Sequence, residues 1–127
     1  EGITFSHKYH FEKLLATMHQ PPRLIRLAGG AAHSPVWTQM FADVLGYPVQ
    51  TVQANETGAL GCAIAVAAAV GDYPSLPEAA AAMCRLSVPV YPDAARKQIY
   101  ERKYALYLKT IECLDGLWTD MQALIEE

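Results

Sequence analysis

The feature that most constrains this chain is a pair of adjacent glycines, Gly29 and Gly30, between an apolar run and a strong helix start. The run at 23–28 is short and is bounded by glycine, which favours a buried strand. Ser34 followed by Pro35 is typical of a helix N-cap with proline at the first helical position. The sequence therefore predicts a strand, a tight turn and a helix in that order.

A turn of this kind can bind a phosphate group. Two glycines allow a tight turn and leave no Cβ between the backbone and a ligand. The free amides at the following helix N-terminus offer donors and a partial positive charge to an anion. No Gly-Lys-Ser/Thr follows the glycines, and the spacing G-x-G-x-x-G is absent, so neither a Walker loop nor the dinucleotide fingerprint is present. Glycine turns are also common structural joints, and both interpretations stay open on this pattern alone.

The segments around the turn alternate between helical and strand patterns. Apolar spacing predicts a helix over 3–18, closed by two prolines, and a helix from Ser34 to about Leu45 with Gly46 as its left-handed end. Residues 49–52 are predicted to form a second strand. This order favours an α/β layered domain, and two strands make a thin sheet, so we expect further strands outside this chain.

The second half of the sequence is predicted to be mostly helical. Asn55 is expected to cap a helix over 56–70, with Glu56 in its first turn. A short helix is expected over 76–84, within a segment that contains four prolines. Asp93 is expected to begin a long final helix, in which Gly116 would mark a kink or an early end.

Composition excludes several classes of protein. Hydrophobic residues make up 52 % of the 127 residues and the formal net charge is -3, without a basic run that would attract a nucleic acid. No apolar stretch is long enough to cross a bilayer and no signal peptide is visible, which predicts no membrane partner and a cytoplasmic protein. Cys62, Cys84 and Cys113 lack metal-ligand spacing and are predicted to be reduced thiols. Because the chain begins at Glu1 instead of Met, we expect a fragment.

Four ordered blocks of sequence resemble one family. They are EGITF at 1–5, LAGGAAHSPVW at 27–37, MFADVLG at 40–46 and ETGALGCA at 56–63. In this order the blocks resemble the FGGY carbohydrate kinases, which show a Gly-Gly-(Gly)-Ala-x-Ser-x-x-Trp pattern, then Ala-Asp-x-x-Gly, then Glu-x-x-Ala-x-Gly-Ala-Ala. Within that family the chain is most similar to L-xylulose and xylulose kinases. The resemblance weakens after Asp72.

The resemblance implies a fold and a division of labour. It implies part of an actin-like ATPase (RNase-H-like) fold, α/β and mostly helical with a short sheet, with 1–127 forming the C-terminal portion of the second, nucleotide-side domain. It implies ATP with Mg²⁺, the metal held mainly by an upstream catalytic domain that is absent here, and a pentulose-like sugar as substrate. Backbone atoms of Gly29, Gly30 and Ala31 would approach the ATP phosphates, and Ser34 would lie near the adenosine. No catalytic or metal-binding residue falls within the chain, so the fragment is expected to be inactive alone.

Two other interpretations of the chain stay open. It could be a non-catalytic interaction module whose apolar faces bind a protein partner or form a homodimer, or a piece of another actin-like ATPase, in either case with a structural glycine turn. Several further residues are given structural interpretations. Trp37 is expected to pack its helix on the sheet, His33 to be solvated, Gly58 and Gly61 to allow close helix packing, and Tyr100, Tyr104 and Tyr107 to be core or interface residues.

Overall fold

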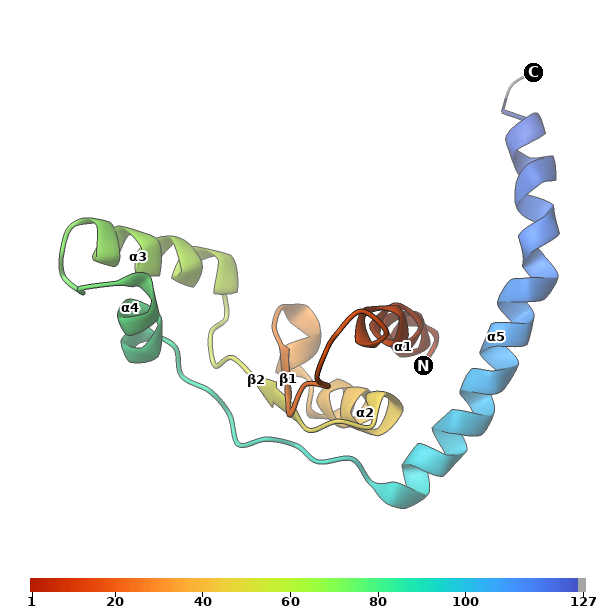
Figure 1. Ribbon diagram of the computed structural model, residues 1–127, viewed down its shortest axis with the longest axis horizontal. Coiled ribbons are helices and arrows are strands. Elements are labelled where there is room, and N and C mark those ends of the chain that lie inside the picture. Colours follow the sequence, from red (N-terminus) through yellow and green to blue (C-terminus); the bar gives the residue numbers. More distant parts are fainter. Residues whose placement is uncertain (126–127) are drawn as a thin grey trace.

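The computed structural model describes residues 1–125 and has five α-helices, one 3₁₀ helix and two strands in that range (Figure 1). In chain order the elements are α1 (Gly2–Leu15), β1 (Ile25–Leu27), η1 (Gly30–His33), α2 (Pro35–Leu45), β2 (Val49–Thr51), α3 (Thr57–Ala69), α4 (Leu76–Met83) and α5 (Ala94–Ala123).

The two strands are parallel neighbours joined by the crossover helix α2. Ile25 lies opposite Val49 and Leu27 opposite Thr51 in the register. The segment at 85–90 runs antiparallel along the other edge of β2, where Val49 and Val90 exchange two backbone hydrogen bonds of 2.8 and 2.7 Å. In the described part of the chain, β1 therefore has the only sheet edge without a neighbour.

Helix α2 is the centre of the core because it is packed on two sides. On one side its Phe41 and Ala42 are buried against Val49 of β2. On the other side its Val44 is buried with Phe5 of α1 and Tyr104 of α5. Tyr100, Tyr104 and Tyr107 of α5 were correctly predicted to be core or interface residues. Partly buried neighbours of this second cluster are Tyr9, Met40, Tyr100, Tyr107 and Leu108.

The predicted helix signals around α2 are confirmed. The Ser34 hydroxyl accepts a hydrogen bond from the backbone N–H of Trp37 at 3.4 Å, and Pro35 is the first helical residue. Gly46 ends the helix with φ of 75°, the left-handed conformation that glycine adopts without steric cost. Asp93 begins α5 as predicted, and its carboxylate accepts from the backbone N–H of Arg96 at 2.9 Å.

Three predictions about helix ends are wrong. Helix α1 ends at Leu15, so the residues up to 18 lie beyond it. Helix α3 has Glu56 as its N-cap residue, one position later than the predicted Asn55, and without a side-chain capping bond. Helix α5 runs unbroken through Gly116, because glycine inside a helix lowers its stability by only about 1 kcal/mol and leaves the backbone hydrogen bonds intact.

The molecule has a body and two arms (Figure 1). The body contains α1, α2 and the sheet, α3 and α4 pack together as one arm, and the last half of α5 projects on the other side as the second arm. Among the described helices, none is both long enough and apolar enough to span a membrane.

Candidate functional site

The candidate site is the turn that leaves the carboxyl end of β1. Gly29 has φ of 83°, in the left-handed region that favours glycine, and so redirects the chain within one residue. The next four residues, Gly30–His33, form the 3₁₀ helix η1, which the sequence analysis treated as a simple turn. The two short elements η1 and α2 then follow one another, separated only by Ser34.

The turn has free backbone donors on an open surface. Within residues 1–125, no backbone hydrogen bond uses the N–H groups of Gly29, Gly30 or Ala31. Gly29 and Gly30 are exposed, and no heavy atom of the described chain would lie within 4 Å of a Cβ built on either one. Unpaired amides beside open space are what a phosphate group requires of a backbone site.

The other two predicted binding residues are Ala31 and Ser34, and Ala31 is held in place by contacts with the core. The side chain of Ala31 packs against the cluster of Phe41 and Val49, which leaves its backbone to face outward. Ser34 is half-buried, and its carbonyl oxygen accepts from both the N–H and the hydroxyl of Thr38, at 2.9 and 3.1 Å. Trp37 packs α2 against the sheet as predicted. His33, also as predicted, is exposed.

Helix α3 starts at the same edge of the sheet as the turn, because it follows the carboxyl end of the parallel strand β2. Ligands of α/β sheets bind at this edge. Glu56 stands before the first residue of α3, where it is exposed and makes no capping bond with its side chain. Gly58 and Gly61 were predicted to allow close helix packing, but within the described chain nothing lies within 4 Å of a Cβ at either position.

One carboxylate belongs to β1, η1 and α2, the elements that build the turn, and it is that of Asp43. The sequence has no Asp or Glu between Glu12 and Asp43. Asp43 is 1 % exposed, and its Oδ1 accepts from Gln39 Nε2 at 2.8 Å and from the backbone N–H of Asp93 at 2.7 Å. A carboxylate held in this way is a structural acceptor.

Asp43 is the residue whose role the sequence analysis missed. The sequence pattern gave it no role, yet its carboxylate joins the end of α2 to the start of α5. One signal in the sequence could have identified it: Asp43 is a single carboxylate between Ala42 and Val44 on an otherwise apolar helix segment. A charged residue in such a position is retained when it satisfies buried donors.

Two groups have shifted pKa values, the Glu1 carboxyl and the Tyr104 hydroxyl, and both lie away from the turn, between α1 and α5. The hydrogen bond from Lys103 Nζ to the Glu1 carboxylate, 2.7 Å long, lowers the pKa of Glu1. Burial raises the pKa of the Tyr104 hydroxyl, and its 2.7 Å hydrogen bond to Glu12 raises it further. Both shifts thus arise at a helix–helix contact and have structural causes.

A parallel strand pair, a crossover helix and free amides at the strand end define an α/β domain with an exposed turn at the carboxyl edge of its sheet. Comparison with known proteins makes this class specific. The C-terminal domain of the FGGY family of carbohydrate kinases matches residues 1–70. The chain belongs to this family.

Two individual relatives are kinases by their names. The chain is 36 % identical over 116 residues to the L-xylulose/3-keto-L-gulonate kinase of Escherichia coli K12, covering 91 % of this chain and 23 % of the relative. It is 38 % identical over 99 residues to the autoinducer-2 kinase of Yersinia pestis, covering 74 % of this chain and 19 % of that protein.

The fold is also that of a solved kinase. A ligand-bound xylulose kinase from Lactobacillus acidophilus superposes with a TM-score of 0.80 at 19 % identity, over 94 % of this chain and 24 % of that one. The chain therefore spans a quarter or less of the proteins it matches. These comparisons confirm the predicted family, the likeness to xylulose kinases and the partial actin-like ATPase fold, mostly helical with a short sheet.

Proposed function

We propose that the chain is the C-terminal, nucleotide-side part of an ATP-dependent kinase that phosphorylates a pentulose-like sugar in the cytoplasm. The observation that carries the proposal is the open turn after β1, whose three consecutive amides have no backbone partner among the described residues. In this proposal Gly29, Gly30 and Ala31 donate these amides to the ATP phosphates, and Ser34 lies near the adenosine.

The proposal assigns the chemistry to an upstream domain. Phosphoryl transfer requires Mg²⁺ to neutralise charge and a carboxylate to orient the sugar hydroxyl. Asp43 is buried and bonded to Asp93, and no other carboxylate belongs to β1, η1 or α2. Mg²⁺ and the catalytic base would therefore come mainly from the other domain, and this chain alone would not turn over substrate.

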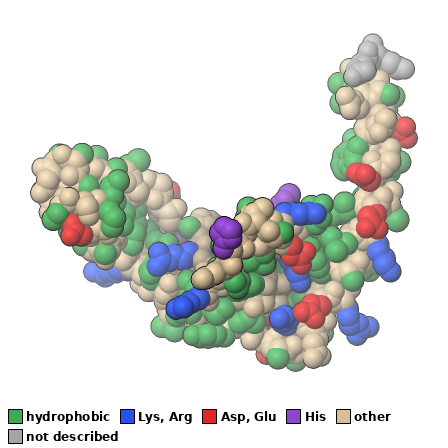
Figure 2. Space-filling model, viewed as in Figure 1, with side chains coloured by type: hydrophobic (Ala, Val, Ile, Leu, Met, Phe, Trp, Pro, Cys, Tyr) green, Lys and Arg blue, Asp and Glu red, His purple; other side chains and the backbone are tan. Residues whose placement is uncertain are grey.

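Helix α3 supports the proposal that residues 1–127 are part of a larger domain. It contains no charged residue, yet only its Ile64 is buried, and Val66 is 60 % exposed. A helix that is apolar on all sides is normally enclosed by protein. Figure 2 shows hydrophobic side chains gathered on the arm that α3 and α4 form. This exposed apolar surface fits a chain that is completed by further elements of a kinase.

The test is nucleotide binding at the turn followed by turnover in the full-length protein. Titration of the 127-residue chain with ATP, followed by amide NMR, should shift the Gly29, Gly30 and Ala31 resonances more than those of Gly71, a control glycine with φ of 87° that lies far along the chain. The full-length protein should phosphorylate L-xylulose or D-xylulose with ATP and Mg²⁺. If the full-length protein phosphorylates autoinducer-2 or 3-keto-L-gulonate but neither xylulose, the pentulose assignment is wrong and the kinase assignment holds.

A second function, an interaction module with a structural turn, has one observation in its favour, namely the exposed apolar faces of α3 and α5. It predicts no ATP-dependent shift at Gly29 or Gly30, even in the full-length protein at millimolar nucleotide. It also predicts a stable complex with another protein or a homodimer. The NMR titration and sedimentation of the same sample separate the two functions.

A further inference from the structure

Helix α5 has one continuous apolar stripe, of which only the first half is packed. With about 100° per residue, the members of this stripe fall within an arc of about 100° on the helix. In the first half, Tyr100, Tyr104 and Tyr107 pack against the buried Phe5 of α1. The stripe continues past Ile111 with Leu114, Trp118 and Met121 of the helix and with Ile125 in the turn just after its end; these four residues are here called the distal stripe.

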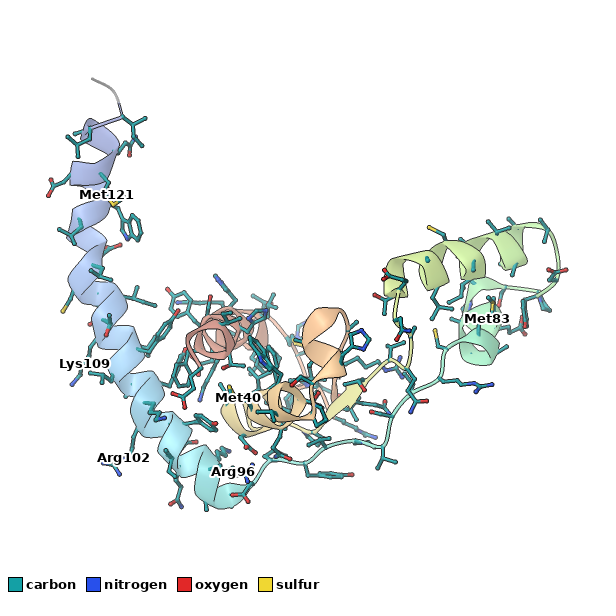
Figure 3. The ribbon with its side chains drawn as sticks, turned by 180° about the vertical axis from the view of Figure 1, so that it is seen from behind. Met40, Met83, Arg96, Arg102, Lys109 and Met121 are labelled. Carbon is teal, nitrogen blue, oxygen red and sulfur yellow. The ribbon has the colours of Figure 1, made fainter. Side chains whose placement is uncertain are left out.

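The distal stripe has no partner in the described chain. Every residue from 112 to 125 is exposed. The four side chains of the distal stripe are 44 %, 59 %, 54 % and 84 % exposed, in chain order. Figure 3 places Met121 on the projecting part of α5, far from Met40 in the body. A helical segment without a packed apolar face is only marginally stable in water, so a surface of this kind requires a partner.

The other side of the same segment is polar, which gives the surface a direction. Lys109 and Asp120 lie about 180° from the stripe at 100° per residue, and Figure 3 labels Lys109 on the outward side of α5. The side opposite the stripe thus carries these two charges, whereas the stripe itself carries none.

The negative charge of the segment disfavours pairing of the distal stripe with the same stripe of a second copy. Residues 110–125 contain Glu112, Asp115 and Asp120, and no Lys or Arg. Two such segments paired through their stripes would bring the two Asp115 carboxylates, which flank the stripe, to the contact without a compensating cation, and like charges across a helix pair are destabilising. The surface instead suits an apolar partner that is neutral or basic at its rim.

The course of α5 is shared with an intact kinase. The likeness to the xylulose kinase from L. acidophilus covers 94 % of this chain, so it includes part of the segment 112–125, and it covers only 24 % of that protein. The helix thus projects in the same way inside a chain about four times as long, where the other three quarters are available to cover it.

We infer that the distal stripe of α5 is the surface on which the amino-terminal part of the full-length kinase docks, so that α5 ties the two parts together. This inference rests on the proposed function only in requiring an upstream kinase part. Its chemistry is independent of ATP, since the stripe is on a different element from the turn at Gly29.

The test compares amide hydrogen exchange of residues 110–125 in the 127-residue chain and in the full-length protein, with no substitution needed. Exchange should be at least tenfold slower in the full-length protein. Leu114→Asp with Trp118→Asp in the full-length protein should restore the fast exchange of the isolated chain to within twofold. The matched control, Thr119→Asp with Ala123→Asp, adds the same charge at the same spacing but outside the arc of the stripe, and should keep the protection.

Several outcomes overturn the inference. Equal exchange in the two proteins does so, and so does protection that appears only at concentrations where sedimentation shows a dimer, which would make a second copy the occupant. An upstream coding sequence without a kinase part also overturns it. Failure of the proposed function would be separate: a full-length protein that protects the stripe but neither binds ATP nor phosphorylates a sugar supports the docking and contradicts the kinase assignment.

Discussion

Asp43 at the end of α2 accepts a hydrogen bond of 2.7 Å from the backbone N–H of Asp93, which in turn caps α5. The two aspartates thus connect the helix that follows the candidate nucleotide turn to the helix that projects from the body. The other Asp43 oxygen, Oδ2, is buried without a hydrogen bond in the described chain, and the Arg96 guanidinium lies 4.0 Å from it. One carboxylate therefore fixes the direction in which α5 leaves the domain.

We predict that Asp43→Ala lowers the free energy of unfolding by about 2–4 kcal/mol, because it leaves the Asp93 N–H and the Gln39 amide without their buried acceptor. Asp43→Asn should cost less than Asp43→Ala, since the amide oxygen can still accept from Asp93. The measurement is urea unfolding followed by circular dichroism. Asp115→Ala, on the exposed part of α5, is the control and should change stability by less than about 0.5 kcal/mol. A loss equally small for Asp43→Ala would contradict the structural role.

The Ser34 cap is predicted to contribute modestly. Ser34→Ala removes the acceptor of the Trp37 N–H and should lower the free energy of unfolding by about 0.5–1 kcal/mol, near the low end for N-caps because the bond is 3.4 Å long. Ser34→Asp keeps an acceptor and places a negative charge at the helix N-terminus, so it should retain the stability of the wild type. Thermal unfolding of the three proteins decides the point, and a stability loss for Ser34→Asp equal to that for Ser34→Ala would show that capping is not involved.

Local signals predicted the parts of the fold that depend on local chemistry. Ser34-Pro35 and Gly46 mark the ends of α2 correctly, because capping and the left-handed end are decided within a few residues. The segment at 85–90 was not predicted as a partner of β2, although Val90 and Val49 exchange two hydrogen bonds. This segment contains Pro89, which disfavours a strand, and its pairing is decided by a strand about 40 residues away in sequence.

The candidate site was predicted from the same local pattern, with two limits. The glycine pair indicated free amides, but the 3₁₀ helix η1 was not foreseen, since short 3₁₀ segments have little sequence signature. Asp43 was missed because its partner, the N–H of Asp93, is 50 residues away. Contacts of this length are set by tertiary packing, which a pattern in one segment does not contain.

Gly29 and Gly30 are predicted to respond differently to alanine. Gly29→Ala puts a Cβ at φ of 83° and should cost about 1–2 kcal/mol of stability. Gly30 has no such φ, and nothing lies within 4 Å of its Cβ position, so Gly30→Ala should leave stability within about 0.5 kcal/mol. If the turn binds phosphate, Gly30→Ala should still weaken ATP binding in the full-length protein, because the methyl group would occupy ligand space. Unchanged ATP affinity for Gly30→Ala, measured by calorimetry, would contradict backbone binding at this residue.

Tyr104 is predicted to make stability fall at high pH. Burial and the bond to Glu12 raise its pKa above the ordinary value of 10.0, so the folded protein holds the hydroxyl proton more tightly than the unfolded chain does. This contribution is complete below about pH 10 and is lost as the pH rises toward the folded-state value. Because other groups of the protein also change charge at alkaline pH, the informative quantity is a difference in stability between variants.

Tyr104→Phe isolates the effect of this hydroxyl. At pH 8 the variant should be less stable than the wild type by about 1–3 kcal/mol, because it loses a hydrogen bond to a carboxylate. Between pH 10 and pH 11 the gap should narrow by on the order of 1 kcal/mol, since only the wild type must then keep a proton that its unfolded chain releases. Tyr91→Phe, at an exposed tyrosine outside the core, is the control and should follow the wild type at every pH. A gap between wild type and Tyr104→Phe that stays constant up to pH 11 in urea unfolding would show that the hydroxyl proton is held no more tightly in the folded protein than in the unfolded chain.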